Sequence, residues 1–420
     1  MSDYPIIDDD RAPPPAPAAG PAGLTQKLAW VVAAASLLGA VFSALSTSDF
    51  INHLDRQVHS IHCSFIPGAH AELGESGCRT VMMSPYSSLF RESLWGGMPI
   101  SLLALAVFSY LTFRAVSFAL RGPLTKGEST FLLAAAALPL VMSVIYGFIA
   151  ATRIHAVCKL CVGVYVTSTI AFVAALIAHL KTAPEETWDP ERKQPGAWFG
   201  EGVVFVAVLA LLYAVASPTS EKTLKGCGTL VRKDDVGGVF IPFGGKGNTQ
   251  SIAVLDPLCP ACRAFDQRLE ASGLINRLKL DMVLFPLDST CNWMVKESLH
   301  PGACAVSEAM LCDKDAAPQV LEYAFANQEA LRDEASRDEA ALRRRLEQKF
   351  PKVKGCLGSA AIKNKLNKSL RWAVANALPV LTPQLFVGDK RVCDEDTDLG
   401  LEFTLASMLR EPSGKGRGKR

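Results

Sequence analysis

The sequence predicts a bundle of membrane-spanning helices followed by an α/β domain. Crossing a bilayer takes roughly 20 apolar residues, and five stretches qualify, at about 28–47, 98–120, 130–152, 162–180 and 200–217. After them, a strand-like run leads into Cys259-Pro260-Ala261-Cys262 and then into a helical pattern. A second Cys-x-x-Cys, Cys158-Lys159-Leu160-Cys161, stands at the start of the fourth apolar stretch.

The composition fits a membrane protein with thiol chemistry. Of the 420 residues, 49% are hydrophobic, and the mean hydropathy of +0.21 is too high for an ordinary soluble protein. The net charge is only +2, so no bulk field indicates nucleic acid as a partner. The twelve cysteines are many for a reducing cytosol, and they indicate an oxidising compartment, a metal site or thiol redox chemistry.

The basic residues predict the orientation of the spans. Residues 1–27 are rich in Pro, Ala and Asp, which is typical of a disordered tail, and no cleavage site follows the first apolar run. That run is therefore expected to be a retained anchor. Two loops carry the flanking basic residues, and the positive-inside rule places both in the cytoplasm: Arg114, Arg121 and Lys126, then Lys181, Arg192 and Lys193. The N-terminus is then cytoplasmic, and loop 48–97 and everything after Ser217 face outward.

We expect five regions along the chain. They are the disordered tail 1–27, a membrane domain 28–181, a linker with the fifth span 182–217, an extracytoplasmic α/β domain 218–410 and a basic tail 411–420. Within the α/β domain, strands are expected at Ser251–Leu255 and Leu278–Leu287, a helical insertion at 292–376, a short hairpin around Gly388-Asp389 and a closing helix at Leu399–Leu409.

The soluble Cys-x-x-Cys has the placement of a redox dithiol. At a helix N-terminus, the first thiol meets unpaired N–H groups and the positive end of the helix dipole, which stabilise a thiolate. Cys259 is therefore expected to be the exposed nucleophile, and Cys262 the buried thiol that resolves a mixed disulfide. A structural disulfide or half of a zinc site are the alternatives, but a zinc ribbon needs a second ligand pair in the same domain, and we find none nearby.

The soluble domain resembles the DsbA-like branch of the thioredoxin superfamily over about residues 235–410. The resemblance rests on the strand, Cys-x-x-Cys and helix order and on Thr382-Pro383 before a later strand. It implies that Pro383 is cis and lies against the dithiol, where Thr382 and Pro383 bind the substrate backbone. The family often buries an acidic residue six positions before the nucleophile, but Ala253 stands there. Asp256 is nearer in sequence, and strand alternation does not place it.

The membrane half resembles the vitamin K epoxide reductase family over about residues 28–181. The motifs that carry the resemblance occur in the family's order: the loop cysteines Cys63 and Cys78, a segment Cys-x-x-Val-x-x-Ser-x-Tyr-Ser that starts at Cys78, Gly97-Met98-Pro99, and the Cys-x-x-Cys at the membrane. Two features depart from the pattern. The loop cysteines are fifteen residues apart, wider than usual, and residues 88–95 look like an insertion.

This second resemblance implies an electron path to a membrane quinone, either ubiquinone or menaquinone. Cys158 and Cys161 would be the quinone-side pair, with Cys161 nearer the ring, and Cys63 and Cys78 would shuttle between this pair and the soluble dithiol. Four further residues would contact the quinone: Ser84, Tyr86, Ser87 and Tyr165. Without the resemblance, both tyrosines would be read as aromatic residues of the membrane interface.

Six cysteines of the soluble domain remain, and six cysteines allow 15 pairings, among which sequence does not choose. We expect structural disulfides Cys291–Cys304, Cys312–Cys356 and Cys227–Cys393. His300 precedes Cys304 in a His-Pro-Gly-Ala-Cys run, where a loop or helix-cap histidine is favoured over a metal ligand. No metal site is expected.

Taken together, the motifs predict a quinone-dependent thiol-disulfide oxidoreductase in a bacterial inner membrane. It would form disulfides in exported proteins that carry free cysteines, and the expected partners are those proteins, the quinone pool and the bilayer, with no nucleic acid. Two alternatives stay open. One is a membrane-anchored disulfide reductase or isomerase with reversed electron flow, and the other is a non-enzymatic metal-binding or redox-sensing membrane protein.

Overall fold

The computed structural model describes residues 21–54, 77–183, 195–217 and 227–410. The chain divides into two compact units, each described here by itself. The first unit contains the chain up to Ala44 together with Leu103–Ile149 and Leu160–Leu209. The second contains Leu45–Leu102, Ala150–Lys159 and the chain from Ala210 onward. The first Cys-x-x-Cys therefore straddles the division between Lys159 and Leu160.

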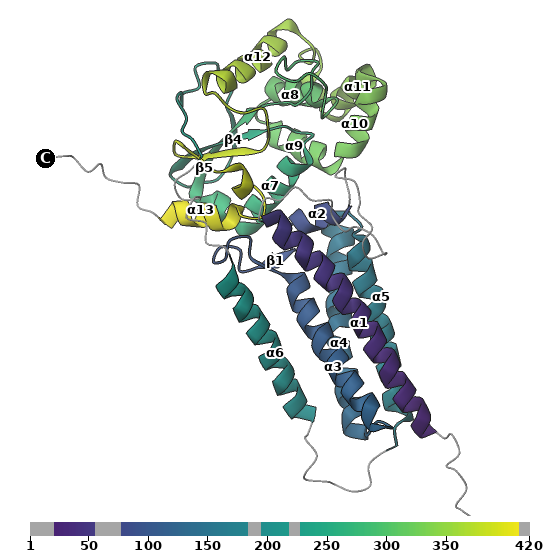
Figure 1. Ribbon diagram of the computed structural model, residues 1–420. Helices are drawn as coiled ribbons and strands as arrows, with labels where there is room; N and C mark the ends of the chain where they lie inside the picture. The colour runs from purple at the N-terminus through teal and green to yellow at the C-terminus, as the bar shows by residue number, and fades with distance from the viewer. Residues whose placement is uncertain (1–20, 55–76, 184–194, 218–226, 411–420) are drawn as a thin grey trace, which may run out of the picture. The chain divides into compact units, whose positions relative to one another are not determined.

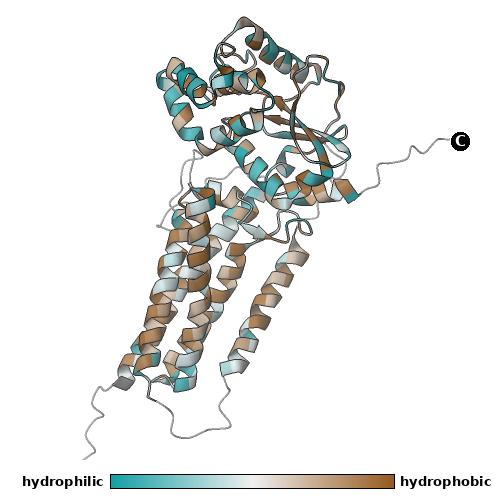
Figure 2. Cartoon of the chain, turned by 180° about the vertical axis from the view of Figure 1, so that it is seen from behind, coloured by the Kyte–Doolittle hydropathy of each residue, from teal (hydrophilic) through white to brown (hydrophobic). Residues whose placement is uncertain are grey.

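Five helices have the length and composition to cross a membrane, as the sequence predicts. They are α1 (Pro21–Leu54), α3 (Ile100–Arg121), α4 (Lys126–Ile149), α5 (Lys159–Lys181) and α6 (Pro195–Ala216). Figure 2 shows that they are mostly apolar along their length, whereas the α/β domain alternates between hydrophilic and hydrophobic residues. Helix α4 continues into a π-helical turn, η1 (Ala150–Ile154), before the first Cys-x-x-Cys.

Close contacts join the helices of the first unit. A Cβ atom at Gly39 of α1 would lie 2.7 Å from the ring of Phe108, and one at Gly163 of α5 would lie 2.8 Å from the ring of Phe42. These two glycines therefore allow α1 to pack closely against α3 and α5. In Figure 1, α1, α3, α4 and α5 lie side by side and α6 lies beside them.

The helix ends that flank the two loops expected in the cytoplasm meet at one end of the bundle. Thr25 near the start of α1 accepts a hydrogen bond from the amide of Leu124, and Lys126 donates to the carbonyl of His179 near the end of α5. Arg114 forms an ion pair with Glu201 at the start of α6. The starts of α1 and α6, the α3–α4 turn and the end of α5 thus share one side, as the positive-inside argument requires.

The α/β domain of the second unit is built on a five-stranded sheet. The strands are β3 (Ile241–Gly244), β4 (Thr249–Leu255), β5 (Leu278–Leu284), β6 (Gln384–Val387) and β7 (Lys390–Arg391), in the spatial order β3-β5-β4-β6-β7. Strand β4 is parallel to β5 and antiparallel to β6. A central strand that leads into the Cys-x-x-Cys helix, beside an antiparallel strand that follows a cis-proline, is the arrangement of the thioredoxin fold. This confirms the predicted fold of the soluble domain.

Helices cover both faces of the sheet because the side chains of β4 alternate between them. Ala253 and Leu255 face one core, which includes Phe265 of α7 (Pro260–Ser272) and Leu405 of α13 (Leu401–Arg410). Ile252 and Val254 face the other core, which includes residues of α12 (Ala360–Ala375). The helical insertion is completed by α8 (Ala303–Cys312), α9 (Ala317–Ala326), α10 (Gln328–Arg337) and α11 (Glu339–Lys349).

Three structural disulfides tie this domain, and all three match the expected pairs. They are Cys227–Cys393, Cys291–Cys304 and Cys312–Cys356. The expected hairpin at Gly388-Asp389 and the closing helix are also confirmed, as β6–β7 and α13. Strand β3 was not predicted, since its short run contains Pro242 and Gly244, residues that are depleted in strands.

A folded loop precedes α3 in the second unit. It contains the short helix α2 (Gly77–Met83) and two paired strands, β1 (Ser88–Leu89) and β2 (Met98–Pro99). The residues that look like an insertion, 88–95, form β1 and the turn that leads to β2.

Candidate functional site

The soluble dithiol stands where the sequence places it, between β4 and α7. Cys259 is the N-cap residue of α7 and Pro260 follows as the first helical residue, a position where proline is tolerated because that amide has no helical partner. Cys262 lies within the first turn, and its sulfur accepts a hydrogen bond from the amide of Asp256 at 3.4 Å. Both cysteines are free thiols.

The two thiols have opposite acidities. The hydrogen bond from the Cys262 thiol lowers the pKa of Cys259 to about 7, against the opposing effects of burial and of the Asp256 charge. Burial raises the pKa of Cys262 well above its usual range. At neutral pH, Cys259 is therefore the thiol that supplies a thiolate, and Cys262 keeps its proton until a neighbouring group removes it.

Cys259 is less accessible than expected. Its exposed fraction is only 5%, and that of Cys262 is 0%. The expectation of an exposed nucleophile is therefore wrong. Gln328 at the start of α10 is itself buried, and its Nε2 donates a hydrogen bond to the carbonyl of Cys259 at 2.9 Å.

Thr382 and Pro383 lie at the dithiol, as the resemblance implies. The Thr382–Pro383 peptide bond is cis. The Cys259 thiol donates to the carbonyl oxygen of Thr382 at 3.7 Å. Segments that are 123 residues apart in the sequence thus meet at one sulfur atom.

A buried carboxylate and a histidine complete this site, and sequence reasoning did not place either of them. Asp256 is fully buried after the end of β4, and its Oδ2 lies 2.7 Å from Nδ1 of His300. His300 thus lies in a loop, as expected, but its side chain is only 11% exposed, so it is not a surface residue. The two residues are 44 positions apart, so no local pattern links them. The mismatch at Ala253 was the one available signal, because it directs attention to the next acidic residue along the chain.

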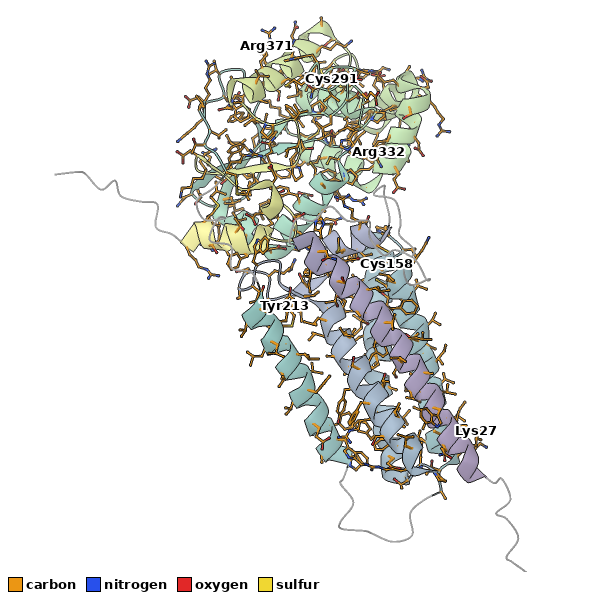
Figure 3. All side chains as sticks on the ribbon, viewed as in Figure 1. Lys27, Cys158, Tyr213, Cys291, Arg332 and Arg371 are labelled. Carbon is orange, nitrogen blue, oxygen red and sulfur yellow. A yellow bond between two sulfur atoms is a disulfide. The ribbon has the colours of Figure 1, made fainter. Side chains whose placement is uncertain are left out.

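The membrane Cys-x-x-Cys lies at the start of α5. Cys158 is buried just before the helix begins at Lys159, and Cys161 is half-buried in its first turn. Figure 3 labels Cys158 at this position. Cys78, Cys158 and Cys161 are each disulfide-bonded.

The loop cysteine Cys78 lies close to the residues that precede this dithiol. A Cβ atom at Gly77, at the start of α2, would lie 2.2 Å from the carbonyl oxygen of Val157. Only glycine allows this approach, which brings the residue before Cys78 against the residue before Cys158. Cys63, the other predicted shuttle residue, lies outside the described residues.

The predicted quinone contacts do not share one environment. Tyr165 is half-buried in α5, and its ring would lie 3.7 Å from a Cβ atom at Gly147 of α4. Tyr86 is exposed on the loop. Ser84 and Ser87 belong to the loop's own hydrogen-bond network, where the Ser84 hydroxyl donates to Val81 and the Ser87 hydroxyl donates to the carbonyl of Ser84.

Arg268 of α7 holds this loop to the helix that carries the soluble dithiol. Its side chain is fully buried, and Nε donates to the carbonyl of Met83 at 2.6 Å. Nη2 donates to the carbonyl of Ser84 and to the Ser87 hydroxyl, and Nη1 donates to both carboxylate oxygens of Glu402. All five N–H donors of the guanidinium are thereby used.

The apparent insertion adds to this contact. Arg91 forms a second ion pair with Glu402, at 2.6 Å, and the indole of Trp95 donates to Asp396 at 2.7 Å. Both partners lie in or just before α13. Residues 88–95, which look like an insertion, therefore pack against the α/β domain. This contact gives the extra residues a structural role.

We expect Arg268→Met to lower the free energy of unfolding by about 3 kcal/mol and to loosen residues 77–99. Methionine fills similar space, but it leaves the two carbonyls unpaired and removes one counter-charge of a buried carboxylate. Thermal unfolding of the purified protein measures the first effect, and amide hydrogen exchange of the 77–99 peptides measures the second.

Arg343→Met is the matched control for this variant. Arg343 also pairs with a buried carboxylate, Glu308, at 2.7 Å, but within the helical insertion. It should lower stability without changing exchange in the loop. Equal exchange of residues 77–99 in the two variants would show that Arg268 does not hold the loop.

Comparisons with known proteins bear on both halves of the chain. The model of the vitamin K epoxide reductase family matches residues 30–176. This match confirms the predicted resemblance of the membrane half to that family. No curated protein sequence matches the chain.

Two solved structures are similar to the chain. The oxidoreductase DsbA from Xylella fastidiosa shares 18% identity, with 43% of this chain and 99% of that chain covered and a TM-score of 0.28. Proteus mirabilis ScsC in a transitional conformation shares 16% identity, with 50% of this chain and 90% of that chain covered and the same TM-score of 0.28.

Proposed function

We propose that this protein forms disulfide bonds in exported proteins and passes the electrons to a membrane quinone. The observation that carries the proposal is the pairing of a vitamin K epoxide reductase domain with a thioredoxin-fold dithiol whose first thiol has its pKa lowered to about 7. In this proposal the protein lies in a bacterial inner membrane with its N-terminus in the cytoplasm, and the α/β domain faces the compartment where exported proteins fold.

The first step oxidises the substrate. A substrate thiolate attacks the sulfur of Cys259 in the Cys259–Cys262 disulfide, which forms a mixed disulfide and releases Cys262 as a thiolate. A second substrate thiolate then attacks its own chain's sulfur, and Cys259 leaves. The substrate has lost two electrons and two protons, and the soluble dithiol is reduced. The low pKa of Cys259 favours its departure, because a more acidic thiol is a better leaving group.

The next steps return the soluble dithiol to its disulfide. Its electron pair passes to a loop disulfide of Cys63 and Cys78, and from there to Cys158 and Cys161, each time through a mixed disulfide. The contact of Gly77 with Val157 supports the second transfer, since it brings the start of α2 to the start of the membrane dithiol.

An aromatic side chain stands one turn beyond Cys161 on the same face of α5. It is Tyr165, whose ring lies beside Gly147 of α4. A quinone, when bound, would accept two electrons and two protons, and the Tyr165 ring would hold it by stacking. Cys158 and Cys161 supply the electron pair and return to the disulfide.

The experiment that tests this function uses the purified full-length protein in detergent. A reduced, unfolded substrate protein is supplied with quinone, and free thiols and quinol are measured together. We expect one substrate disulfide per quinol and, without quinone, no substrate oxidation beyond the few equivalents that the protein's own redox disulfides accept. Disulfide rearrangement that needs no quinone would instead support the isomerase alternative.

We expect the loop cysteines to be trapped in mixed disulfides when their partner is removed. Cys63→Ala and Cys78→Ala should each leave the remaining loop cysteine bonded either to the soluble dithiol or to the membrane dithiol, because no second thiol resolves the intermediate. Non-reducing gels and mass spectrometry identify the linked peptides.

The two variants also test the order of the relay. Full transfer to quinone in Cys63→Ala would mean that Cys78 acts alone or with another partner. The matched control is the double variant Cys312→Ser, Cys356→Ser, which removes a structural disulfide of the helical insertion and should trap no intermediate.

A further inference from the structure

The structure assigns His300 to the chemistry of the soluble dithiol: we propose that its imidazolium, held by Asp256, provides the positive charge that stabilises the Cys259 thiolate. The dipeptide between the two cysteines, Pro260-Ala261, has no ionisable group to do this. The inference rests on the dithiol being redox-active, but not on the identity of the final electron acceptor.

The Asp256 carboxylate is fixed by three donors. Its Oδ1 accepts from the amide of Leu258 at 2.7 Å, and its Oδ2 accepts from the amide of Leu287 at 2.7 Å in addition to the contact with His300. Two backbone amides and an imidazole therefore converge on one fully buried carboxyl group. The imidazole is the only one of these three groups that can bring a positive charge.

The same residue contacts both cysteines through its backbone. The Asp256 carbonyl accepts from the amide of Cys259 at 3.2 Å, and its amide donates to the sulfur of Cys262 at 3.4 Å. Hydrogen bonds thus connect the imidazole of His300, Asp256, the Cys262 sulfur and the backbone of Cys259. A bare anion at this point would oppose formation of a thiolate, whereas an Asp256–His300 ion pair carries no net charge.

The loop that carries His300 is fastened so that the imidazole stays in place. The amide of His300 donates to the carbonyl of Leu287. The Cys291–Cys304 disulfide closes the loop, and Asp288 accepts hydrogen bonds from the amides of Gly302 and Cys304. The His300 side chain is only 11% exposed. Little solvent lies between it and its partners, so their charges are weakly screened.

The groups around Cys259 and His300 raise the pKa of each residue in some cases and lower it in others. Besides the Cys262 hydrogen bond, the charge of His300 and the hydrogen bond to Thr382 lower the pKa of Cys259, whereas burial and the Asp256 charge raise it. Burial lowers the pKa of His300, but the hydrogen bond and charge of Asp256, together with the charges of Cys259 and Asp288, outweigh it and raise that pKa above its usual value. Each of the two groups thus favours the charged form of the other.

The test measures the alkylation rate of Cys259 against pH in the full-length protein in detergent, after reduction. Iodoacetamide reacts with the thiolate, and mass spectrometry of the Cys259 peptide reports this one site. The pH at which the alkylation rate reaches half of its maximum is the midpoint, and it reports the pKa of Cys259. We expect His300→Gln to move this midpoint upward from about 7. If the midpoint moves by one unit, the rate at pH 6 falls roughly tenfold, because each unit changes the thiolate fraction tenfold there. Glutamine keeps a donor for Asp256 but carries no charge.

His53→Gln is the matched control. His53 pairs with Asp398 at 2.8 Å, the same kind of His–Asp contact in another part of the same unit. The His53→Gln variant should leave the midpoint of Cys259 alkylation unchanged. A midpoint in His300→Gln equal to that of the wild-type protein would overturn the proposal, since a purely structural histidine predicts that result.

A second measurement needs no variant and remains decisive if His300→Gln does not fold. Linkage requires that blocking the Cys259 thiolate lowers the proton affinity of His300. The rate at which diethylpyrocarbonate modifies His300, followed by mass spectrometry against pH, should show a lower midpoint after Cys259 is alkylated. An unchanged midpoint would contradict the proposal. Neither measurement uses quinone, so a failure of quinone reduction leaves this result standing on its own.

Discussion

Cys259→Ser is expected to abolish oxidation of a reduced protein substrate and to leave reduction of quinone by a small dithiol at the wild-type rate. Serine matches cysteine in shape, but it cannot form a disulfide, so the substrate finds no sulfur to attack. A small reductant does not need the soluble dithiol, because it can reach the loop or membrane cysteines directly. Both rates are measured on the same purified protein, one with an unfolded substrate and one with dithiothreitol.

The control for this variant is again Cys312→Ser, Cys356→Ser. Removal of that disulfide opens a loop of 44 residues, and disulfides of this kind typically contribute about 2–4 kcal/mol. The control therefore destabilises the soluble domain but should keep both activities. Loss of both activities together in Cys259→Ser would show that the two dithiols do not act as separate modules.

The fold was predictable wherever one local pattern dominates. Apolar length alone located all five spans, because a bilayer imposes a minimum on each of them. The short, mostly apolar run Ser251–Leu255 located β4, and the Cys-x-x-Cys located the start of α7. The edge strand β3 was not predicted. It is a strand because it pairs with β5, and this tertiary contact leaves no pattern in its own short sequence.

The parts of the site that escaped prediction are contacts between distant segments. His300 meets Asp256 only because the loop after β5 folds back over the end of β4. Arg268 resembles any polar residue of an amphipathic helix, yet it is fully buried by a loop that lies 185 residues earlier. Gln328 of the helical insertion likewise bonds to the carbonyl of Cys259, a residue that lies 69 positions earlier in the sequence. Local periodicity carries no information on such pairs, since each is set by tertiary packing.

Ser84 and Ser87 have a structural role that their motif did not predict. The signature Ser-x-Tyr-Ser predicts contacts with quinone, and this stays a prediction. In the structure, the Ser84 carbonyl and the Ser87 hydroxyl both accept from Arg268, so the segment forms part of the contact between the loop and α7. The signature therefore helps to shape the loop that carries Cys78.

Cys161→Ala is expected to abolish reduction of quinone by every reductant, whether an unfolded protein or a small dithiol. Both routes end at the Cys158–Cys161 pair, the dithiol at the start of an apolar span, and a single remaining thiol cannot take up and release an electron pair as a disulfide does. Quinol formation is measured directly, with substrate thiols followed in parallel. The soluble disulfide and the loop disulfide should still accept one electron pair each, so a burst of at most two substrate disulfides without quinol is the specific signature.

Thr167→Ala is the matched control for Cys161→Ala. Thr167 lies two turns further along α5, is buried, and bonds only to carbonyls of its own helix, Gly163 and Val164. The control makes a similar loss of volume in the same helix without removing a thiol, and it should keep most of the wild-type rate. Normal quinone turnover in Cys161→Ala would rule out the membrane dithiol as the last donor. The electrons would then have to leave from another donor, although Cys78 lies on the short helix α2 and not on one of the five apolar helices.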